Sequence, residues 1–389
     1  MPSPSTPVAA DDIDTDRIVE ELKTWVSMES HTPDADAVTA LAAHVEGRAA
    51  SAGLSVRRVA GTKGFGDSLV VRHGSDREKG IVVLAHLDTV HAAGTIGKEL
   101  PLREDGDKIY GPGIYDMKSG ALMALEALKI AASKDNGPAL PITILFVPDE
   151  EMGSVSSLPL IQEAGRNARY ALVVEPARDG GKIVVARKGV AMYDIAVHGR
   201  ASHAGTNPQG GRSAVREAAR LVLELEALND PARGVTVTVG TIRGGTGRNT
   251  IPALCELLVD VRVPDRAAAD EILPKIEGLR PSSGDFRIEV SGGLNRPPFE
   301  QTAEAKRLFD HAAEIAHPLG IALEGMSTGG GSDGNFTAAL GVPTLDGLGA
   351  DGAGAHTFSE HIFKSSIAPR TALLANLMLT LGKDAAGEN

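Results

Sequence analysis

Three short apolar segments of strand type lie in the first half of the chain, at residues 81–85, 142–147 and 171–174. Between the first two, residues 119–133 carry apolar side chains at helical spacing. A strand, a helix and a second strand in this order favour crossover units, which build a largely parallel sheet covered by helices. The alternation therefore predicts an α/β domain.

A different pattern occupies the region from residue 191 to residue 290. Apolar and polar residues alternate there in segments typical of half-buried strands, and two segments are amphipathic at helical spacing. The order strand, helix, strand, strand, helix, strand is that of a ferredoxin-like domain; the segments are 191–198, 213–228, 235–239, 257–263, 266–279 and 286–290.

This second pattern interrupts the first, so we expect an inserted domain rather than an appended one. A chain of 389 residues also exceeds what one compact core usually holds. We therefore predict a catalytic α/β domain formed by residues 1–187 and 296–389. Residues 188–295 would form the inserted α+β domain.

The charge and hydropathy of the chain limit its partners. The formal net charge is −12 at pH 7 and no long basic run is present, so nucleic acid is not expected as a partner. No apolar stretch approaches the roughly 20 residues of a membrane-spanning helix. Residues 1–14 lack the pattern of an export signal. We therefore expect a cytoplasmic protein with no membrane partner.

Metal-binding residue types follow each of the three apolar segments. The first is followed by His86 and Asp88, the second by residues 148–151 (Pro-Asp-Glu-Glu), and the third by Glu175. In open α/β sheets, sites form just beyond the carboxyl ends of the strands, so these side chains should meet at one edge.

Two further candidates lie in glycine-rich segments. Asp116 belongs to residues 111–120, where a glycine-rich turn enters the predicted helix, and His356 follows a Gly-Ala-Gly-Ala loop. The single cysteine, Cys255, leaves no internal disulfide and no thiolate site, so a transition metal must bind to His, Asp and Glu. Such ligands suit Zn²⁺, and also Mn²⁺ or Co²⁺.

Spacing within these segments suggests how the residues act. Asp88 shares a strand face with His86, so it can accept the other ring N–H of that imidazole. Glu150 and Glu151 are consecutive and point in different directions, so one can bind a metal while the other takes a proton from metal-bound water. From the residues alone, a solvated acidic loop and ordinary turn residues remain open alternatives to a metal site.

Seven segments together resemble the glutamate carboxypeptidase, acetylornithine deacetylase and succinyl-diaminopimelate desuccinylase family of zinc metallopeptidases. They occur in the family's order, and the pattern is most similar to glutamate carboxypeptidase, especially at residues 111–120 and 296–299. The inserted domain falls where this family keeps its lid. The segments are AHLDTV (85–90), GPGIYDMKSG (111–120), PDEEMGS (148–154), VVEP (173–176), GRASHAG (199–205), GRNTIP (247–252) and GAHTFSE (354–360).

The resemblance implies a zinc-peptidase-like fold that holds two divalent metal ions, most simply Zn²⁺. Asp116 should bridge the two ions. His86 and Glu175 should complete the site of one ion, and Glu151 and His356 that of the other.

The resemblance also implies a reaction. Glu150 should be the general base that activates a metal-bridging water for attack on an amide bond, and Asp88 should orient His86. A glutamate at position 175 is typical of the family's carboxypeptidases and deacylases. The substrate should therefore be a peptide or an N-acyl amino acid. The sequence does not distinguish a carboxypeptidase activity from a deacylase activity.

Candidate substrate contacts lie elsewhere in the chain. An anionic carboxylate needs a cation, and the guanidinium of Arg296 can pair with it in bidentate fashion. By resemblance, Asn249 contacts the amide, and His203 on the lid stabilises the oxyanion from the partner subunit of a homodimer. Lys182 is a further candidate for a second anionic group. An ordinary turn histidine at 203 and a surface arginine at 296 are the alternatives.

The other eight histidines, His91 and His361 among them, are expected to be structural or solvated. The sequence disfavours two other classes of function. A non-catalytic binding protein with the same fold is disfavoured because both Glu150 and Asp116 are present. A mononuclear-metal oxidoreductase is disfavoured because no dinucleotide-binding fingerprint occurs.

Overall fold

Strand β3 (Gly80–His86) is buried at every position and lies inside a six-stranded sheet of the computed structural model, which describes residues 8–75 and 78–383. The described chain divides into two units. The larger unit holds the chain up to Ala186, Gln301–Ser327 and the chain from Ser332 onwards. The inserted unit holds Arg187–Glu300 and Thr328–Gly331. It therefore extends beyond the expected 188–295 at both ends, so that Arg187 and residues 296–300 belong to it and not to the larger unit, and it gains one separate short segment.

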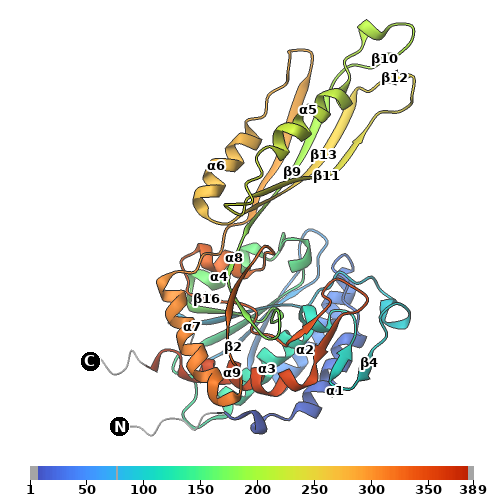
Figure 1. Ribbon diagram of the computed structural model, residues 1–389. Helices are drawn as coiled ribbons and strands as arrows, with labels where there is room; N and C mark the ends of the chain where they lie inside the picture. The colour runs from blue at the N-terminus through green and yellow to red at the C-terminus, as the bar shows by residue number, and fades with distance from the viewer. Residues whose placement is uncertain (1–7, 76–77, 384–389) are drawn as a thin grey trace. The chain divides into compact units, whose positions relative to one another are not determined.

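The sheet of the larger unit is mostly parallel, and Figure 1 labels its strands β2 and β16. Strand β3 pairs in parallel with β6 and β7, and β16 adds in parallel to β7. Strands β2 and β1 extend the other side in antiparallel fashion. The order is β1 (Ser55–Val59), β2 (Ser68–His73), β6 (Ile142–Val147), β3, β7 (Ala168–Val173) and β16 (Thr344–Leu345).

Helices cover both faces of this sheet. Successive side chains of a strand point to opposite faces, and in β3 the apolar side chains on both faces are buried. Val83 of β3 belongs to the apolar core shared with α1, α2, α3, α7 and α9, whereas Val82 and Leu84 pack with α4 and α8 on the other face. The helices are α1 (Thr15–Ser27), α2 (Ala35–Ser51), α3 (Ser119–Ser133), α4 (Leu158–Arg166), α7 (Ala303–Ala316), α8 (Gly334–Ala339) and α9 (Ile367–Thr380).

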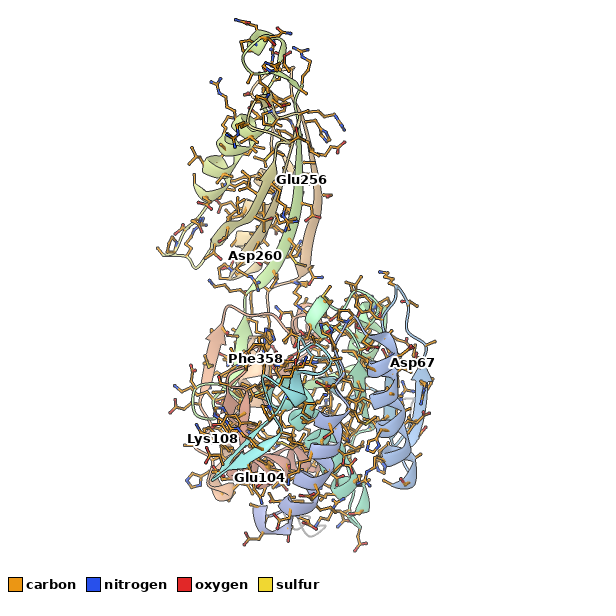
Figure 2. All side chains as sticks on the ribbon, turned by 90° about the vertical axis from the view of Figure 1, so that its right-hand side faces the viewer. Asp67, Glu104, Lys108, Glu256, Asp260 and Phe358 are labelled. Carbon is orange, nitrogen blue, oxygen red and sulfur yellow. The ribbon has the colours of Figure 1, made fainter. Side chains whose placement is uncertain are left out.

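A small four-stranded sheet of the larger unit brings distant segments together. Its order is β17 (Gly352–Ala353), β18 (His361–Phe363), β5 (Lys108–Tyr110) and β4 (Arg103–Asp105). His361 is paired with Tyr110, so the loop before β18 lies beside the loop after β5. In Figure 2, Glu104 and Lys108 mark β4 and β5, and Phe358 marks the loop that leads into β18. Strand β8 (Ile183–Arg187) pairs separately with β15 (Gly325–Thr328).

The inserted unit is a four-stranded antiparallel sheet with two helices. Its strand order is β11 (Thr236–Gly244), β13 (Leu254–Val263), β9 (Gly189–His198) and β14 (Arg287–Arg296). One face of β9, with Tyr193 and Ile195, is buried with residues of α5 (Ala214–Glu226) and α6 (Arg266–Glu277). A short ladder joins β10 (Ser202–His203) to β12 (Thr250–Ile251).

This connectivity, β-α-β-β-α-β in one antiparallel sheet, is that of a ferredoxin-like fold. The predicted fold class, a mostly parallel α/β domain with an inserted α+β domain, is therefore confirmed. Within residues 8–75 and 78–383, no helix has the length and apolar character needed to cross a membrane.

Candidate metal centre

The carboxyl ends of three neighbouring strands bring the first candidate residues together. Strand β3 ends at His86, which is paired in register with Val147, the last residue of β6. A short 3-10 turn, Glu150–Met152, follows β6 almost at once. Glu175 lies two residues beyond the end of β7. The parallel register therefore places these side chains at one edge of the sheet, as the sequence predicts.

The five candidate ligands surround one another closely. Nε2 of His86 lies 3.2 Å from Oδ1 of Asp116 and 3.8 Å from Oε1 of Glu175. Nε2 of His356 lies 3.1 Å from Oε2 of Glu151 and 3.6 Å from Oδ2 of Asp116. The two oxygens of Asp116 thus face two different imidazoles.

Glu150 belongs to the same cluster. Donor atoms of His86, Glu150 and Glu175 lie within 4.8 Å of one another, and so do those of His86, Asp116 and Glu151. All six residues that the sequence predicts for the metal ligands and the base are therefore gathered at one place.

Burial and mutual charge shift the pKa values of the cluster. Burial, followed by the negative charge of Asp116, raises the pKa of Glu175 well above its usual range. Burial also acts to raise the pKa of Asp116, but the hydrogen bond and the charge of His86 outweigh it and lower that pKa to about 2. The hydrogen bond to Glu151 raises the pKa of His356 to about 9. More carboxylates than cations share this space, so a bound cation would stabilise their ionised forms.

The donor set fits divalent metal ions. Carboxylate oxygens and imidazole nitrogens, with no sulfur among them, are ligands that Zn²⁺, Co²⁺ and Mn²⁺ accept. Oε1 of Glu151 is buried and has no hydrogen-bond partner among the residues that the structure describes. A buried polar atom without a partner is costly, and a metal ion would provide one. The residues present therefore fit a metal pair.

Asp88 holds several residues of the cluster in position. Its carboxylate is fully buried. Nδ1 of His86 lies 3.0 Å from the backbone carbonyl oxygen of Asp88 and 3.3 Å from its Oδ1. Oδ1 also accepts the backbone N–H of Glu150 at 3.3 Å, and Oδ2 accepts that of Glu151 at 3.2 Å. The hydroxyl of Thr32 donates to Oδ2 at 2.9 Å. Asp88 thus orients one candidate ligand and also the segment that carries both glutamates.

His356 lies on the loop between β17 and β18, and its side chain is 52% exposed. His356 has a φ of 64°, and Gly354, two residues earlier, has a φ of 83°. The paired strands β18 and β5 bring this loop beside the loop of Asp116. The flexible glycine loop that the sequence predicts does fold back onto the cluster.

Two residues of this region were not predicted to act at the site. Glu360, 1% exposed, accepts the backbone N–H of Asp116 at 3.0 Å and lies 2.6 Å from Nε2 of His91. The sequence contains one signal for Glu360, since it closes the segment 354–360 that also carries His356. Nothing in the sequence connects it to His91.

The candidate substrate contacts His203, Asn249 and Arg296 belong to the inserted unit. Nδ1 of His203 accepts the backbone N–H of Gly205 at 3.2 Å. The carbonyl of Asn249 accepts the backbone N–H of Ala204 at 2.9 Å, so these two candidates lie close together. Arg296 is 5% exposed at the end of β14.

Lys182 lies in the larger unit, just before β8. Its Nζ is 3.1 Å from Oε2 of Glu324, and both side chains are well exposed. This is a surface ion pair, and its partner Glu324 is not one of the residues of the cluster.

Comparison with known proteins agrees with the geometry. The profile of Peptidase family M20/M25/M40 matches residues 82–380. Carboxypeptidase G2 of Pseudomonas sp. (strain RS-16) is 32% identical over 377 residues, which cover 94% of this chain and 89% of that protein. Succinyl-diaminopimelate desuccinylase of Azoarcus sp. (strain BH72) is 28% identical over 297 residues, 72% of this chain and 76% of the relative.

A solved structure shares the fold. The Bacillus subtilis YXEP protein, described as a dinuclear metal binding peptidase from the M20 family, superposes with a TM-score of 0.66 at 15% identity. The match covers 94% of this chain and 97% of that one.

These findings confirm the resemblance on which the predicted activity rests. The enzyme is a metal-dependent hydrolase of amide bonds, and the alternatives of a non-catalytic protein and an oxidoreductase are not supported. The chain belongs to peptidase family M20/M25/M40.

Proposed function

We propose that this enzyme uses two zinc ions to cleave the amide bond of a peptide or N-acyl amino acid that carries a free carboxylate. One observation supports the dinuclear site above all others. Asp116 presents Oδ1 to His86 at 3.2 Å and Oδ2 to His356 at 3.6 Å. A carboxylate that faces two imidazoles through its two oxygens is suited to bridging two ions.

The remaining ligands divide between the two positions. Glu175 joins His86 and Asp116 at one position, and Glu151 joins His356 and Asp116 at the other. The mixture of nitrogen and oxygen donors suits zinc, and also cobalt or manganese. When bound, such ions polarise the amide carbonyl and lower the pKa of water towards about 7.

In the proposed reaction Glu150 moves the proton. Its carboxylate lies with His86 and Glu175, and its backbone N–H is held by Asp88 at 3.3 Å. It accepts a proton as a water oxygen attacks the carbonyl carbon, and it then delivers that proton to the amine nitrogen as the C–N bond breaks. The products are a carboxylic acid and a free amine. Glu150 ends the cycle ionised.

Recognition of the substrate is assigned to the inserted unit. Arg296 would pair with the substrate carboxylate, Asn249 would contact the amide, and His203 would donate to the oxyanion from the partner subunit of a homodimer. Lys182 would serve only a second anionic group and must first leave Glu324. The homodimer and the cytoplasmic location stay predictions.

Two reactions are compatible with this site. A carboxypeptidase recognises the carboxylate on the amine side of the scissile amide, and a deacylase of the desuccinylase kind also meets a carboxylate on the acyl side. The greater similarity to carboxypeptidase G2, over 94% of this chain, favours the first reaction.

Metal analysis and a substrate panel test the proposal together. We expect two equivalents of metal per chain, loss of hydrolysis on chelation and recovery with Zn²⁺. The panel comprises N-acyl amino acids and dipeptides with acidic, basic or apolar carboxyl-terminal residues, together with the same compounds amidated at the carboxyl end. A single metal equivalent, or hydrolysis that survives chelation, contradicts the dinuclear mechanism.

A further inference from the structure

Glu360 is a buried carboxylate whose hydrogen-bond donors come from two segments of the metal centre. Oε1 accepts the backbone N–H of Tyr115 at 2.8 Å and that of Asp116 at 3.0 Å. Oε2 accepts the backbone N–H of Gly113 at 3.2 Å and lies 2.6 Å from Nε2 of His91. A carboxylate can only accept, so this nitrogen of His91 carries its proton.

The loop that holds Asp116 depends on an acceptor at this place. Asp116 has φ of −114° and ψ of 92°, and Met117 has φ of −137° and ψ of 33°, so the backbone here is not helical. Amides in such a loop cannot all find carbonyls of their own helix, and buried amides without acceptors are costly. Glu360 serves three of them, including the amide of Asp116 itself.

The topology fixes where Glu360 lies. It directly precedes β18, whose first residue His361 is paired with Tyr110 of β5. The ladder continues for one further hydrogen bond, from the N–H of Gly111 to the carbonyl of Glu360 at 3.4 Å. His356 is four residues upstream on the same loop. One side chain therefore joins the loop of Asp116 to the loop of His356.

His91 connects a third segment to this arrangement. It is 5% exposed and lies five residues after His86, in the segment that also contains Asp88. Because its Nε2 is bonded to Glu360, this nitrogen is not available to a metal ion. Both oxygens of Glu360 are likewise occupied by donors, so Glu360 is not a sixth ligand.

We propose that Glu360, oriented by His91, is the positioning residue that holds Asp116 between His86 and His356. The inference rests on the proposed dinuclear function and adds to it. Glu360 is buried and both its oxygens are bonded within the protein, so its contribution is to the separation and orientation of the ligands. Partners behind metal ligands typically contribute about 10–100-fold to metal affinity or activity.

Replacement of Glu360 by glutamine keeps the shape and removes half of the acceptors. The new NH₂ group would face either the amides of Tyr115 and Asp116 or that of Gly113. In Glu360→Gln we expect the affinity for Co²⁺, titrated into metal-free protein, to fall by about 10–100-fold. The visible absorption of bound Co²⁺ should change because the ligands are displaced. We expect kcat to fall within the same range while KM changes little.

Three further substitutions keep the test valid if that variant folds poorly. Glu360→Asp retains the charge but withdraws both oxygens, and it should weaken Co²⁺ binding in the same direction. His91→Leu removes one donor to Glu360 and should weaken Co²⁺ binding, whereas His91→Gln supplies a replacement N–H and should restore most of it. A purely structural role of His91 would not produce this rescue in the metal affinity.

Glu126→Gln is the matched control. Glu126 is 2% exposed, lies on α3 in the same unit, and is paired with Arg17 and with Lys129, the latter at 2.7 Å. Its substitution also removes a buried charge, so it should lower the melting temperature. It should leave the Co²⁺ affinity and spectrum unchanged.

The outcomes separate this inference from the proposed function. Wild-type affinity and spectrum for Co²⁺ in Glu360→Gln and His91→Leu would overturn the positioning role and leave the dinuclear hydrolase intact. Wild-type protein that binds fewer than two Co²⁺ ions would instead overturn the proposed function. Equal losses of affinity in Glu126→Gln and Glu360→Gln would show a general stability effect and would also overturn the positioning role.

Discussion

The buried carboxylate of Asp88 accepts the backbone N–H of Glu150 at 3.3 Å. The same oxygen lies 3.3 Å from Nδ1 of His86. One carboxylate thus links the end of β3 to the turn after β6. Asp88 therefore fixes the position of His86, a candidate metal ligand, relative to Glu150, the proposed proton carrier.

Asp88→Asn should disturb both groups at once. All four groups around the carboxylate are donors, namely Nδ1 of His86, the hydroxyl of Thr32 and the amides of Glu150 and Glu151. The NH₂ group of asparagine would face two of them. We expect metal affinity and kcat each to fall by about 10–100-fold, measured by chelator competition and initial rates. Thr32→Val removes one donor and should have a smaller effect. Unchanged affinity and rate in Asp88→Asn would refute the dual role.

Glu150→Gln should separate metal binding from proton transfer. The amide cannot accept a proton, so turnover should fall by at least about 100-fold, the scale of a lost general base. The five candidate ligands remain, so elemental analysis should still find both metals. Near-normal turnover would remove Glu150 from the reaction.

Metal affinity should rise with pH above neutrality. Glu151 raises the pKa of His356 from 6.5 to about 9, so the metal-free protein keeps a proton on this ligand across that interval. A metal ion must displace the proton, so its affinity should increase by up to about tenfold per pH unit between these values. Competition titrations at several pH values measure the slope. A flat profile over this range contradicts the shift.

The stability of the metal-free protein should show the opposite trend. Because the pKa of His356 is higher in the folded state than its ordinary value of 6.5, its proton stabilises the fold. That contribution is complete below pH 6.5 and is lost as the pH rises through about 9. The melting temperature of chelator-treated protein should lose this contribution over the interval. The group is half exposed, so the change should be modest.

Arg296 should control the affinity for the substrate carboxylate. Loss of a charge-assisted hydrogen bond costs about 1.5–3 kcal/mol, so Arg296→Ala should raise KM by roughly tenfold or more. Gly331→Ala should act in the same direction, because a Cβ at Gly331 would lie 2.6 Å from Cδ of Arg296. Substrates amidated at the carboxyl group are the control, since both variants should treat them as the wild type does. A KM that rises equally for both kinds of substrate would contradict carboxylate recognition by Arg296.

Mixed subunits should reveal whether His203 acts across a dimer. His203→Ala and Glu150→Ala proteins, each inactive alone, should recover partial activity after they are mixed and re-associated. The recovery arises because one of the two sites then has an intact Glu150 and an intact His203 from the partner. Absence of recovery, with heterodimers demonstrated by differently tagged subunits, would assign His203 to the site of its own chain.

Local sequence determined the scaffold of this protein. The apolar strand segments, the helical spacing of residues 119–133 and the alternation from residue 191 onwards depend on neighbours two to four positions apart, and each became the expected kind of element. His86 is the last residue of β3, and Glu150, Glu151 and Glu175 lie shortly after the ends of β6 and β7. The parallel register alone was enough to bring them to one edge.

Tertiary structure decided what holds those residues in place. Asp88 accepts the backbone N–H of Glu150, which is 62 positions away in the sequence. Glu360 accepts the backbone N–H of Asp116, which is 244 positions away. Backbone N–H groups are present at every residue other than proline. The residue types alone therefore do not indicate which backbone N–H will donate a hydrogen bond to a buried carboxylate. Only the folded chain, with β18 beside β5 and β6 beside β3, selects those donors and with them the geometry of the metal centre.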